Sequence, residues 1–436
     1  MNSRIGIGLL GLGTVGSGVA NIILNPENRH PLVSEIELKR VAVRNIDRPR
    51  SIAISPNIFT TEPEEVVDDP STKVIVEVMG GIEPARSLIL RALKAGKSVV
   101  TANKAVIARH GEEIAYTAIK NGVYVLIEAA VGGGIPIIEP LKQSLGGNKI
   151  NRVCGIINGT TNYILSRMEK EGAAFGDVLK TAQELGYAES DPAADIEGLD
   201  AADKISILSG LAYGGAINRE DIPTKGIDKL QSQDVDYASK LGYRVKLLAI
   251  AERINNESIN SLPLAVRVQP TLVSKDHPLA GVNGVNNAIL IEGEPIGEVM
   301  FYGPGAGAGP TASAVVADIL NIAGIKKIEN KTKQLDPLLA ASRWRNCHLV
   351  EEGKIIQSNY IRLITQESPG IIGKIGKIFG QQNVSIQSIV QFDATASSAE
   401  IVVITHQVMQ GQIKSSLDEI RKLDEVIEIA AHMGCL

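Results

Sequence analysis

The segment from Gly186 to Lys204 combines six carboxylates with a single lysine, which stands at its end. Residues 198–213 are predicted to form a helix, in which Asp200 and Lys204 stand four residues apart and project from the same face. A carboxylate beside an ammonium keeps that ammonium charged and oriented. The residues that follow Lys204 are strongly apolar, so we expect the lysine to be half buried, and half-buried lysines usually have a chemical role.

The same segment also fits a simpler interpretation. An acidic loop that opens a surface helix has this composition, because carboxylates are favoured near the positive N-terminal end of a helix. The rest of the chain decides between the two.

Length and composition limit the class of protein. A chain of 436 residues is expected to form two or three domains. Its net charge of -5 argues against a nucleic-acid partner, and its 3% of aromatic residues argue against base-stacking surfaces. Three scattered cysteines indicate reduced thiols in a cytosol, not a disulfide framework or a metal site. No apolar run reaches the roughly 18 residues of a membrane span, so we expect a cytoplasmic protein without a membrane partner.

A glycine-rich turn near the N-terminus has the context that dinucleotide binding requires. A short apolar strand predicted over residues 5–10 runs into the sequence GLGTVG, and residues 15–24 then form a predicted helix. The first glycine allows the tight turn, the second lets the backbone approach a pyrophosphate, and the third lets the helix pack on the strand. The residues expected to contact the cofactor are Gly11, Gly13, Thr14, Val15 and Gly16.

The second predicted strand, 38–43, is followed by Arg44, where an enzyme that uses NAD usually carries an acid for the ribose. An arginine suits the 2′-phosphate of NADP, so the sequence favours NADP(H) over NAD(H). A solvated arginine at the end of a strand is the alternative, and the cofactor preference stays open.

Strands and helices then alternate. The predicted elements are strand 74–79, helix 84–95, strand 98–101, helix 105–120 and strand 124–128. This order indicates a parallel sheet covered on both faces, whose ligands gather at the carboxyl ends of the strands. Thr101 and Lys104, in the sequence TANK, stand at such an end, where the lysine can reach cofactor or substrate. A surface lysine at the start of a helix would look the same.

Glu128 precedes a run of three glycines in the sequence EAAVGGGIP. A backbone curved by three glycines can turn its carbonyls towards one point, where together with Glu128 they would suit a hard cation. A flexible crossover between domains is the commoner explanation of such a run.

From Asn151 the pattern changes to long apolar strands with inserted helices, which indicates a mixed or antiparallel sheet. A polar turn, NGTTN at 158–162, is expected to cap a helix. A second glycine-rich loop at 303–309 precedes a predicted helix at 311–323. We interpret this loop either as an interdomain hinge or as a second contact to the cofactor.

The last part of the chain has its own order of elements. We predict strand 359–365, a helix capped by Ser368 with Pro369 in its first turn, strands 384–391 and 399–405, helix 412–423 and strand 426–429. This βαββαβ order, with apolar alternation in the later strands, suits a sheet with helices on one face.

Several motifs together resemble one enzyme family. GLGTVG, TANK, GGGIP, NGTTNY, GYAESDP and DIEGLDAADK, in this order and at these spacings, resemble homoserine dehydrogenase over the whole chain. The final unit, with its sequence SPGIIGKI, resembles the ACT regulatory domain that many members append. GLGTVG is shared by many dehydrogenases, whereas the acidic pattern that ends in Lys204 is close to diagnostic.

The patterns and the resemblance together imply an α/β fold in three parts. Residues 1–130, completed by 308–330, form a Rossmann-type doubly wound parallel sheet. Residues 131–307 form a central α+β catalytic and dimerisation domain. After a linker at 331–355, residues 356–436 form a ferredoxin-like βαββαβ ACT domain.

Members of the family reduce L-aspartate 4-semialdehyde to L-homoserine, reversibly, with NAD(P)H. The resemblance makes Lys204 the catalytic acid–base lysine and places Lys104 between cofactor and substrate. It gives Asp200 a catalytic and substrate-binding role, and it makes Glu189 and Asp195 substrate-binding residues. The chemistry agrees, because a hydride arriving at a carbonyl carbon leaves an alkoxide that an ammonium can stabilise and protonate.

The resemblance also implies a monovalent cation site and further cofactor contacts. Glu128 and the carbonyls of Val131, Gly133 and Ile135 match the family's site for sodium or potassium. Gly186 and Gly303 match glycines that face the cofactor.

Ligands of ACT-like domains usually sit where the first turn meets the next strand, often across a pair of domains. The corresponding residues are Gly370, Ile371, Asn383 and Ile386. Because homoserine leads towards threonine, we expect threonine to inhibit the enzyme from this place. We also expect a homodimer or a homotetramer.

Two other functions stay in view. A non-catalytic regulator that binds NADPH and an amino acid would keep the glycines, but it has no reason to keep Lys204 among Glu189 and Asp200. A related dehydrogenase could act on another amino-acid-like substrate. Semialdehyde dehydrogenases that need a reactive cysteine are disfavoured, because Cys154 stands inside an apolar strand and is more simply a core residue.

Overall fold

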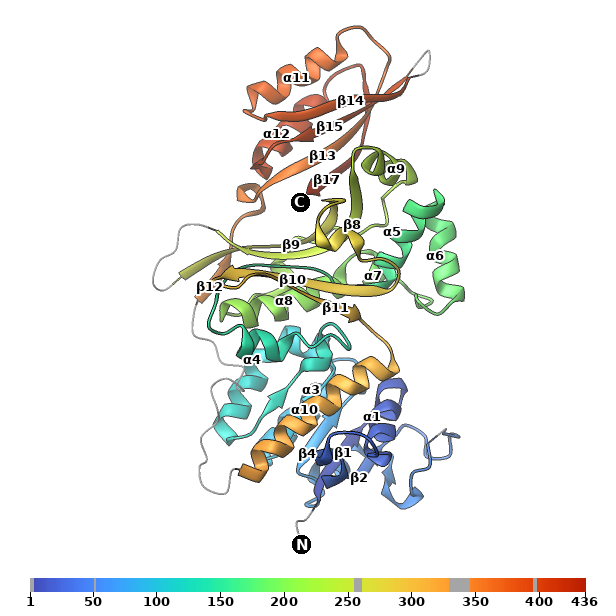
Figure 1. The fold of residues 1–436 in the computed structure, drawn as a ribbon, viewed down its shortest axis with the longest axis vertical. Helices are drawn as coiled ribbons and strands as arrows, with labels where there is room; N and C mark the ends of the chain where they lie inside the picture. Colours follow the sequence, from blue (N-terminus) through green and yellow to red (C-terminus); the bar gives the residue numbers. More distant parts are fainter. Residues whose placement is uncertain (1–3, 51, 255–260, 329–345, 395–397) are drawn as a thin grey trace. The chain divides into compact units, whose positions relative to one another are not determined.

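The computed structural model describes residues 4–50, 52–254, 261–328, 346–394 and 398–436 (Figure 1). They form two compact units. The first comprises Met1–Val153, Asp203–Glu220 and Asn287–Cys347, and the second comprises Cys154–Ala202, Asp221–Asn286 and His348–Leu436. Neither unit is a single stretch of sequence.

The first unit contains a parallel sheet of six strands in the order β3-β2-β1-β4-β5-β6. The strands are β1 (Ile5–Leu10), β2 (Ile36–Ala42), β3 (Phe59–Thr60), β4 (Val74–Glu77), β5 (Ser98–Thr101) and β6 (Val125–Leu126). All four residues of β4 and all four of β5 are buried, as expected for strands covered on both faces. The order is that of a Rossmann fold, whose ligands bind where the strand order reverses, beside β1 and β4. The predicted parallel sheet is confirmed.

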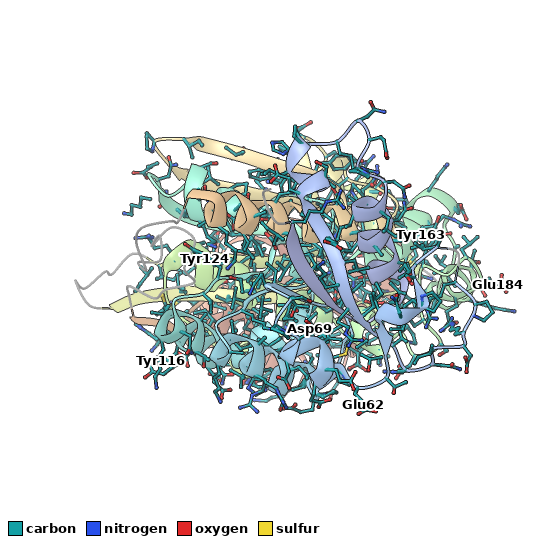
Figure 2. All side chains as sticks on the ribbon, turned by 90° about the horizontal axis from the view of Figure 1, so that it is seen from below. Glu62, Asp69, Tyr116, Tyr124, Tyr163 and Glu184 are labelled. Carbon is teal, nitrogen blue, oxygen red and sulfur yellow. The ribbon has the colours of Figure 1, made fainter. Side chains whose placement is uncertain are left out.

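Helices cover both faces of this sheet. They are α1 (Thr14–Leu24), α2 (Pro63–Asp68), α3 (Ala85–Lys94), α4 (Lys104–Asn121) and α10 (Ala308–Ile328). One apolar core joins α1 and α10 to the sheet, and a second core joins α2, α3 and α4 to it. Tyr124, which is 4% exposed, belongs to the first core, whereas Tyr116 on α4 is 67% exposed and lies at the edge of the view in Figure 2.

Helix α10 returns to this sheet from a late part of the sequence. By length and composition, Ala308–Lys326 is apolar enough to cross a membrane. In the structure, however, Val315, Ile319 and Ile322 are fully buried in the core that α10 shares with α1. The apolar surface of α10 is therefore explained by packing inside the first unit.

Three further strands follow one another in the order β11-β10-β7. They are β7 (Lys149–Ile156), β10 (Asn286–Glu294) and β11 (Gly297–Pro304). Arg152 on β7 pairs with Glu292 on β10, and the buried residues of these strands include the aliphatic Ile289 and Ile291. Helix α8 (Leu199–Tyr213) contributes its later residues to the first unit.

The second unit is built around the antiparallel pair β8 (Tyr243–Arg253) and β9 (Ser261–Ser274). Its helices are α5 (Gly159–Glu171), α6 (Phe175–Glu184), α7 (Ala193–Ile196) and α9 (Ser232–Lys240). Seven consecutive residues of β8 are buried. The expectation of long apolar antiparallel strands with inserted helices is confirmed.

The C-terminal part of the second unit has the predicted βαββαβ order. The six elements of this order are β13 (Ile356–Thr365), α11 (Ile371–Gln381), β14 (Ile386–Ala394), β15 (Ala399–Thr405), α12 (Gln410–Ile420) and β17 (Val426–Cys435). Two short strands, β12 (Asn346–Leu349) and β16 (Val408–Met409), lie outside this order. The strand order is β17-β13-β15-β14, and one apolar core joins both helices to this sheet.

Two details of this part differ from the sequence prediction. Helix α11 begins after Gly370, whose φ of 89° lies in the left-handed region, so Ser368 does not cap the helix and Pro369 lies outside it. Strand β17 continues to Cys435 because its end pairs with both β13 and β9. Of the linker predicted at 331–355, residues 331–345 lie outside the described residues, and 346–349 form β12.

Candidate active site

Helix α8 carries the two groups that the sequence placed at the chemical centre. Asp200 stands in its first turn, and Lys204 stands one turn later on the same face. Asp200 is 6% exposed and Lys204 is 9% exposed. Lys204 is thus more deeply buried than predicted, and a lysine in such a place requires charged or polar partners.

Asn158 joins two of the predicted substrate-binding carboxylates. Its Nδ2 donates to Oδ1 of Asp195 at 2.7 Å and to Oδ2 of Asp200 at 2.9 Å. Its Oδ1 accepts the N–H of Thr161 at 2.9 Å, which makes Asn158 the N-cap of α5. One carboxamide therefore fixes two carboxylates from α7 and α8, and this concentration of negative charge suits an ammonium group.

Glu189 is not part of this arrangement in the structure. Its side chain is exposed, and its backbone carbonyl accepts a hydrogen bond from Gln183. The loop that carries it is anchored to α5, because Thr160 donates to the carbonyl of Tyr187 at 2.6 Å and the rings of Tyr163 and Tyr187 lie 5.0 Å apart. Gly186, at the start of this loop, has a φ of 75° and is exposed.

Asp203 has a structural role on α8. Its carboxylate accepts from Arg219 at 2.9 Å and from Arg109 of α4 at 3.4 Å. Lys104 is the first residue of α4. The ion pair between Asp203 and Arg109 thus fixes the helix that begins with Lys104 against the residues around Lys204 in the first unit.

A buried carboxylate organises the carboxyl ends of β4 and β5. Glu77 is fully buried and accepts the hydroxyl of Thr101 at 2.7 Å and the N–H of Met79 at 2.8 Å. Burial raises the pKa of Glu77. Asn103 donates its N–H to Thr101 and its Nδ2 to the carbonyl of Gly81 at 2.7 Å, and it caps α4. The hydroxyl of Thr101 therefore points into the protein, where it positions the loop before Lys104.

The first glycine loop has the geometry that a dinucleotide requires. Gly11 has a φ of 99°. A Cβ added to Gly16 would lie 2.1 Å from the carbonyl oxygen of Gly11, so the third glycine is needed for close packing. A Cβ on Gly13, in contrast, would meet nothing within 4 Å, so this backbone is open to a ligand. Thr14 and Val15 begin the helix directly behind it, which leaves backbone N–H groups for phosphate oxygens.

The second glycine-rich loop, residues 303–309, and the helix α10 that follows it both pack closely against other glycines of the first unit. A Cβ on Gly18 of α1 would lie 2.7 Å from Cβ of Ala312 on α10. A Cβ on Gly133 would lie 2.4 Å from the carbonyl oxygen of Gly305, and the N–H of Gly134 donates to the carbonyl of Pro304 at 3.1 Å. The loop that contains Gly303 therefore lies beside the triple-glycine run.

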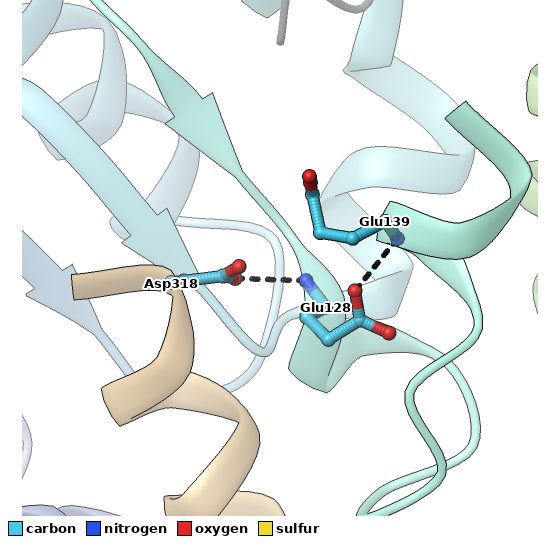
Figure 3. Close-up of side chains that lie close together, drawn as sticks. All are labelled: Glu128, Glu139 and Asp318. Carbon is cyan, nitrogen blue, oxygen red and sulfur yellow. Dashed lines mark hydrogen bonds between the residues drawn. The ribbon is translucent and has the colours of Figure 1, made fainter. Parts of the chain in front are cut away.

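Glu128 uses its side chain to hold the backbone. Its carboxylate accepts the N–H groups of Ile137 at 2.6 Å, Ile138 at 2.9 Å and Glu139 at 2.8 Å. Its own N–H donates to Asp318 at 2.9 Å (Figure 3). Burial raises the pKa of Glu128, and it raises the pKa of Asp318 well above its usual value. The side chain of Glu128 is therefore occupied, while the carbonyls of the buried residues Val131, Gly133 and Ile135 are the remaining oxygens of the predicted cation site.

Arg44 is exposed and is the second residue after β2. Sequence reasoning did not single out Arg48 and Arg50 in the same loop. Arg50 donates to the carbonyls of Asn45 and Ile46, so it closes the loop that presents Arg44. The sequence RNIDRPR at residues 44–50, with its three arginines, was the pattern that could have indicated a basic loop here.

Comparison with known proteins identifies the family. The family profile described as "Homoserine dehydrogenase" matches residues 136–320, and its NAD binding domain matches 11–128. A homoserine dehydrogenase of Synechocystis sp. is 54% identical over 97% of both chains, and that of Bacillus subtilis is 37% identical over 98% of this chain and 96% of its own. This chain belongs to the homoserine dehydrogenase family.

Solved structures of homoserine dehydrogenases agree with this assignment. The enzyme from Thiobacillus denitrificans has a TM-score of 0.90 at 40% identity, with 99% of this chain and 98% of that chain covered. A hyperthermophilic archaeal homoserine dehydrogenase in complex with NADPH has a TM-score of 0.60 at 30% identity and covers 74% of this chain. An ACT domain profile matches 359–425. The NAD-binding domain and the NADPH complex indicate a nicotinamide cofactor, which the open backbone at Gly13 fits.

Proposed function

We propose that the protein reduces L-aspartate 4-semialdehyde to L-homoserine, reversibly, in the biosynthesis of threonine, methionine and isoleucine. The observation that carries this proposal is the pair Asp195 and Asp200, held together by Asn158, with Lys204 one turn further along α8. The carboxylates suit the α-ammonium of an amino-acid substrate. Glu189, which is exposed on the loop before α7, is the third carboxylate proposed to bind the substrate. A non-catalytic regulator would have no use for Lys204 in this place.

Lys204 holds the proton that the reaction needs. The nicotinamide cofactor supplies a hydride to the aldehyde carbon, and the carbonyl oxygen then requires one proton to become the hydroxyl of homoserine. The ammonium of Lys204 stabilises the developing alkoxide and donates that proton, and in the oxidation of homoserine it takes the proton back. Lys104, at the start of α4, lies at the carboxyl edge of the sheet and orients substrate beside the cofactor.

The substrate is tested by competition. Purified protein with NADP is expected to oxidise L-homoserine, with a kcat/KM at least about 10² higher than for L-serine or L-threonine. A higher kcat/KM for another amino alcohol would make this a related dehydrogenase with a different substrate.

The cofactor is NADP(H) in preference to NAD(H). Arg44 is exposed at the end of β2, and Arg50 closes the loop that carries it. We expect Arg44→Asp to lower the ratio of kcat/KM for NADP to that for NAD by about 10-fold or more, because repulsion replaces a charge-assisted contact with the 2′-phosphate. Arg29→Asp, an exposed arginine of the same unit, is the matched control and leaves the ratio unchanged. An unchanged ratio of kcat/KM for the two cofactors in Arg44→Asp would mean that Arg44 does not contact the 2′-phosphate.

A monovalent cation, sodium or potassium, binds the carbonyls of Val131, Gly133 and Ile135 beside Glu128. The positive φ values of Gly132 and Gly133 give this run the curvature that converging carbonyls need. Equal kcat/KM in sodium, potassium and choline chloride would contradict this part of the proposal. The assembly is a homodimer or homotetramer, which light scattering at assay concentration tests.

Threonine is the proposed inhibitor, bound at the start of α11. Gly370 and Asn383 are exposed, and the first N–H groups of α11 suit a carboxylate. Threonine binding at α11 is coupled to helix α9 of the second unit through β13, because Arg362 of β13 donates to Asp234 of α9 at 2.6 Å. A coupling of about 1–3 kcal/mol would suffice for feedback control.

This regulation is best tested by a point variant, because deletion of the ACT domain would also remove Arg362, the ion-pair partner of Asp234 on α9. Asn383 has a φ of 56°, so Asn383→Gly keeps the backbone and removes only the side chain. We expect threonine to inhibit this variant about 10-fold more weakly, at unchanged kcat. Asn28→Gly, at a φ of 60° in the first unit, is the matched control. Full sensitivity in Asn383→Gly would place the effector elsewhere.

A further inference from the structure

Glu77, the last residue of β4, joins the loops that follow two neighbouring strands. Its Oε1 accepts the N–H of Met79 at 2.8 Å, in the loop after β4, and its Oε2 accepts the hydroxyl of Thr101 at 2.7 Å, at the end of β5. Glu77 is fully buried, and both of these donors are neutral. A carboxylate is costly to bury in such surroundings, so its presence calls for an explanation.

The directions of the hydrogen bonds explain why a carboxylate is needed. The N–H of Asn103 donates to the oxygen of Thr101 at 3.0 Å. Because Thr101 accepts this bond, its hydroxyl proton is available for Glu77, and the N–H of Met79 can only donate. Both oxygens of residue 77 must therefore accept. A glutamine would place its NH₂ group against one of the two donors.

Asn103 closes these contacts into a ring of hydrogen bonds. Its Nδ2 donates to the carbonyl of Gly81 at 2.7 Å, in the same loop as Met79. Its Oδ1 accepts the N–H of Val106 at 3.3 Å, as the N-cap of α4. Since Lys104 is the first residue of α4, the ring ties the start of this helix to the loop at 78–81.

The loop at 78–81 lies beside the dinucleotide turn within the first unit. A Cβ added to Gly11 would lie 3.0 Å from the carbonyl oxygen of Val78, and one added to Gly16 would lie 3.3 Å from Cγ2 of the same valine. The N–H of Val78 also donates to the carbonyl of Leu10 at 3.0 Å. The ring of hydrogen bonds therefore connects Lys104 with the backbone on which the cofactor is expected to bind.

We infer that Glu77 is a positioning residue, which through Thr101 and Asn103 holds Lys104 in a fixed place relative to the dinucleotide turn. This inference rests on the proposed dehydrogenase function, in which Lys104 orients the substrate. Glu77 itself touches neither substrate nor cofactor. It acts through the lysine, and displacement of an orienting group by about 1 Å can lower the rate by about 10².

Glu77→Gln tests this role, because it keeps the size of the side chain and removes one acceptor. We expect kcat/KM for homoserine to fall about 10-fold or more. Calorimetry with 2′-phospho-ADP-ribose, which lacks the nicotinamide ring, should show wild-type affinity. Thr101→Val, which removes the hydroxyl and keeps the shape of the side chain, should lower kcat/KM to a similar extent. An unchanged kcat/KM in both variants would overturn the inference, and so would an equal weakening of 2′-phospho-ADP-ribose binding.

Glu65→Gln is the matched control. Glu65 of α2 accepts the hydroxyl of Thr60 at 2.8 Å, and the oxygen of Thr60 accepts the N–H of Glu62 at 3.1 Å. This contact repeats the one between Glu77 and Thr101 at the end of β3. Glu65→Gln is expected to leave kcat/KM for homoserine unchanged, and a fall as large as that in Glu77→Gln would contradict a specific role for Glu77.

A second measurement shows whether Glu77 acts through Lys104. A residue that works only by placing another has no effect once that other residue has been removed. In a Lys104→Met background, Glu77→Gln is therefore expected to lower kcat/KM no further. A full additional loss in the double variant would overturn the inference. Oxidation of homoserine by the wild type tests the dehydrogenase function independently of both variants.

Discussion

Lys204→Met is expected to lower kcat for homoserine oxidation by about 10² or more, while the fold and the affinity for NADP are kept. Methionine has nearly the length of lysine but cannot donate or accept the proton. Lys204 is 9% exposed on α8, so bulk water is a poor substitute for it. Steady-state kinetics and a cofactor titration of the variant give the two quantities.

Lys97→Met is the matched control for this experiment. Lys97 is also a buried lysine, and it donates to Thr72 at 2.8 Å, away from the carboxylates of α8. Its replacement is expected to lower the melting temperature and to leave kcat unchanged. Wild-type turnover in a folded Lys204→Met protein would remove the lysine from the mechanism.

Arg362→Met is expected to lower the free energy of unfolding by about 3–5 kcal/mol, the usual cost of removing one partner of a buried ion pair. Arg362 is 1% exposed and Asp234 is fully buried. Asp234 also accepts the N–H of Gln231, which caps α9, so an uncompensated charge there disturbs both elements. Urea unfolding of the variant measures the loss.

The double variant Arg362→Met with Asp234→Leu supplies the control. It removes both charges and should recover a large part of the lost stability, because two apolar side chains can replace a buried pair. If the free energy of unfolding fell by less than about 1 kcal/mol in Arg362→Met alone, the ion pair would be contributing no more than a surface ion pair does. It would then add little to the stability of the contact between β13 and α9.

Much of the fold follows from local patterns in the sequence. The apolar strands, the GLGTVG turn and the alternation with helices predicted the parallel sheet, and the spacing of Asp200 and Lys204 predicted one helix that carries both. The exact ends of elements were less predictable. Strand β17 runs to Cys435 only because β9 and β13 offer it partners, and the start of α11 depends on the left-handed backbone of Gly370.

The site was predictable in its residue types but not in its hydrogen bonds. Asn158 was expected to cap a helix, and its bridge between Asp195 and Asp200 depends on the tertiary approach of α7 and α8 to that cap. Thr101 was expected to contact the cofactor, but the buried carboxylate of Glu77 takes its hydroxyl.

The most direct test of the central claim identifies the product and the fate of the hydride. Purified protein is incubated with L-aspartate 4-semialdehyde and NADPH that carries deuterium at the hydride-donating carbon, and the product is examined by mass spectrometry and NMR. The account predicts L-homoserine with one deuterium at the carbon that bears the hydroxyl. Absence of homoserine, or homoserine without the label, would contradict it.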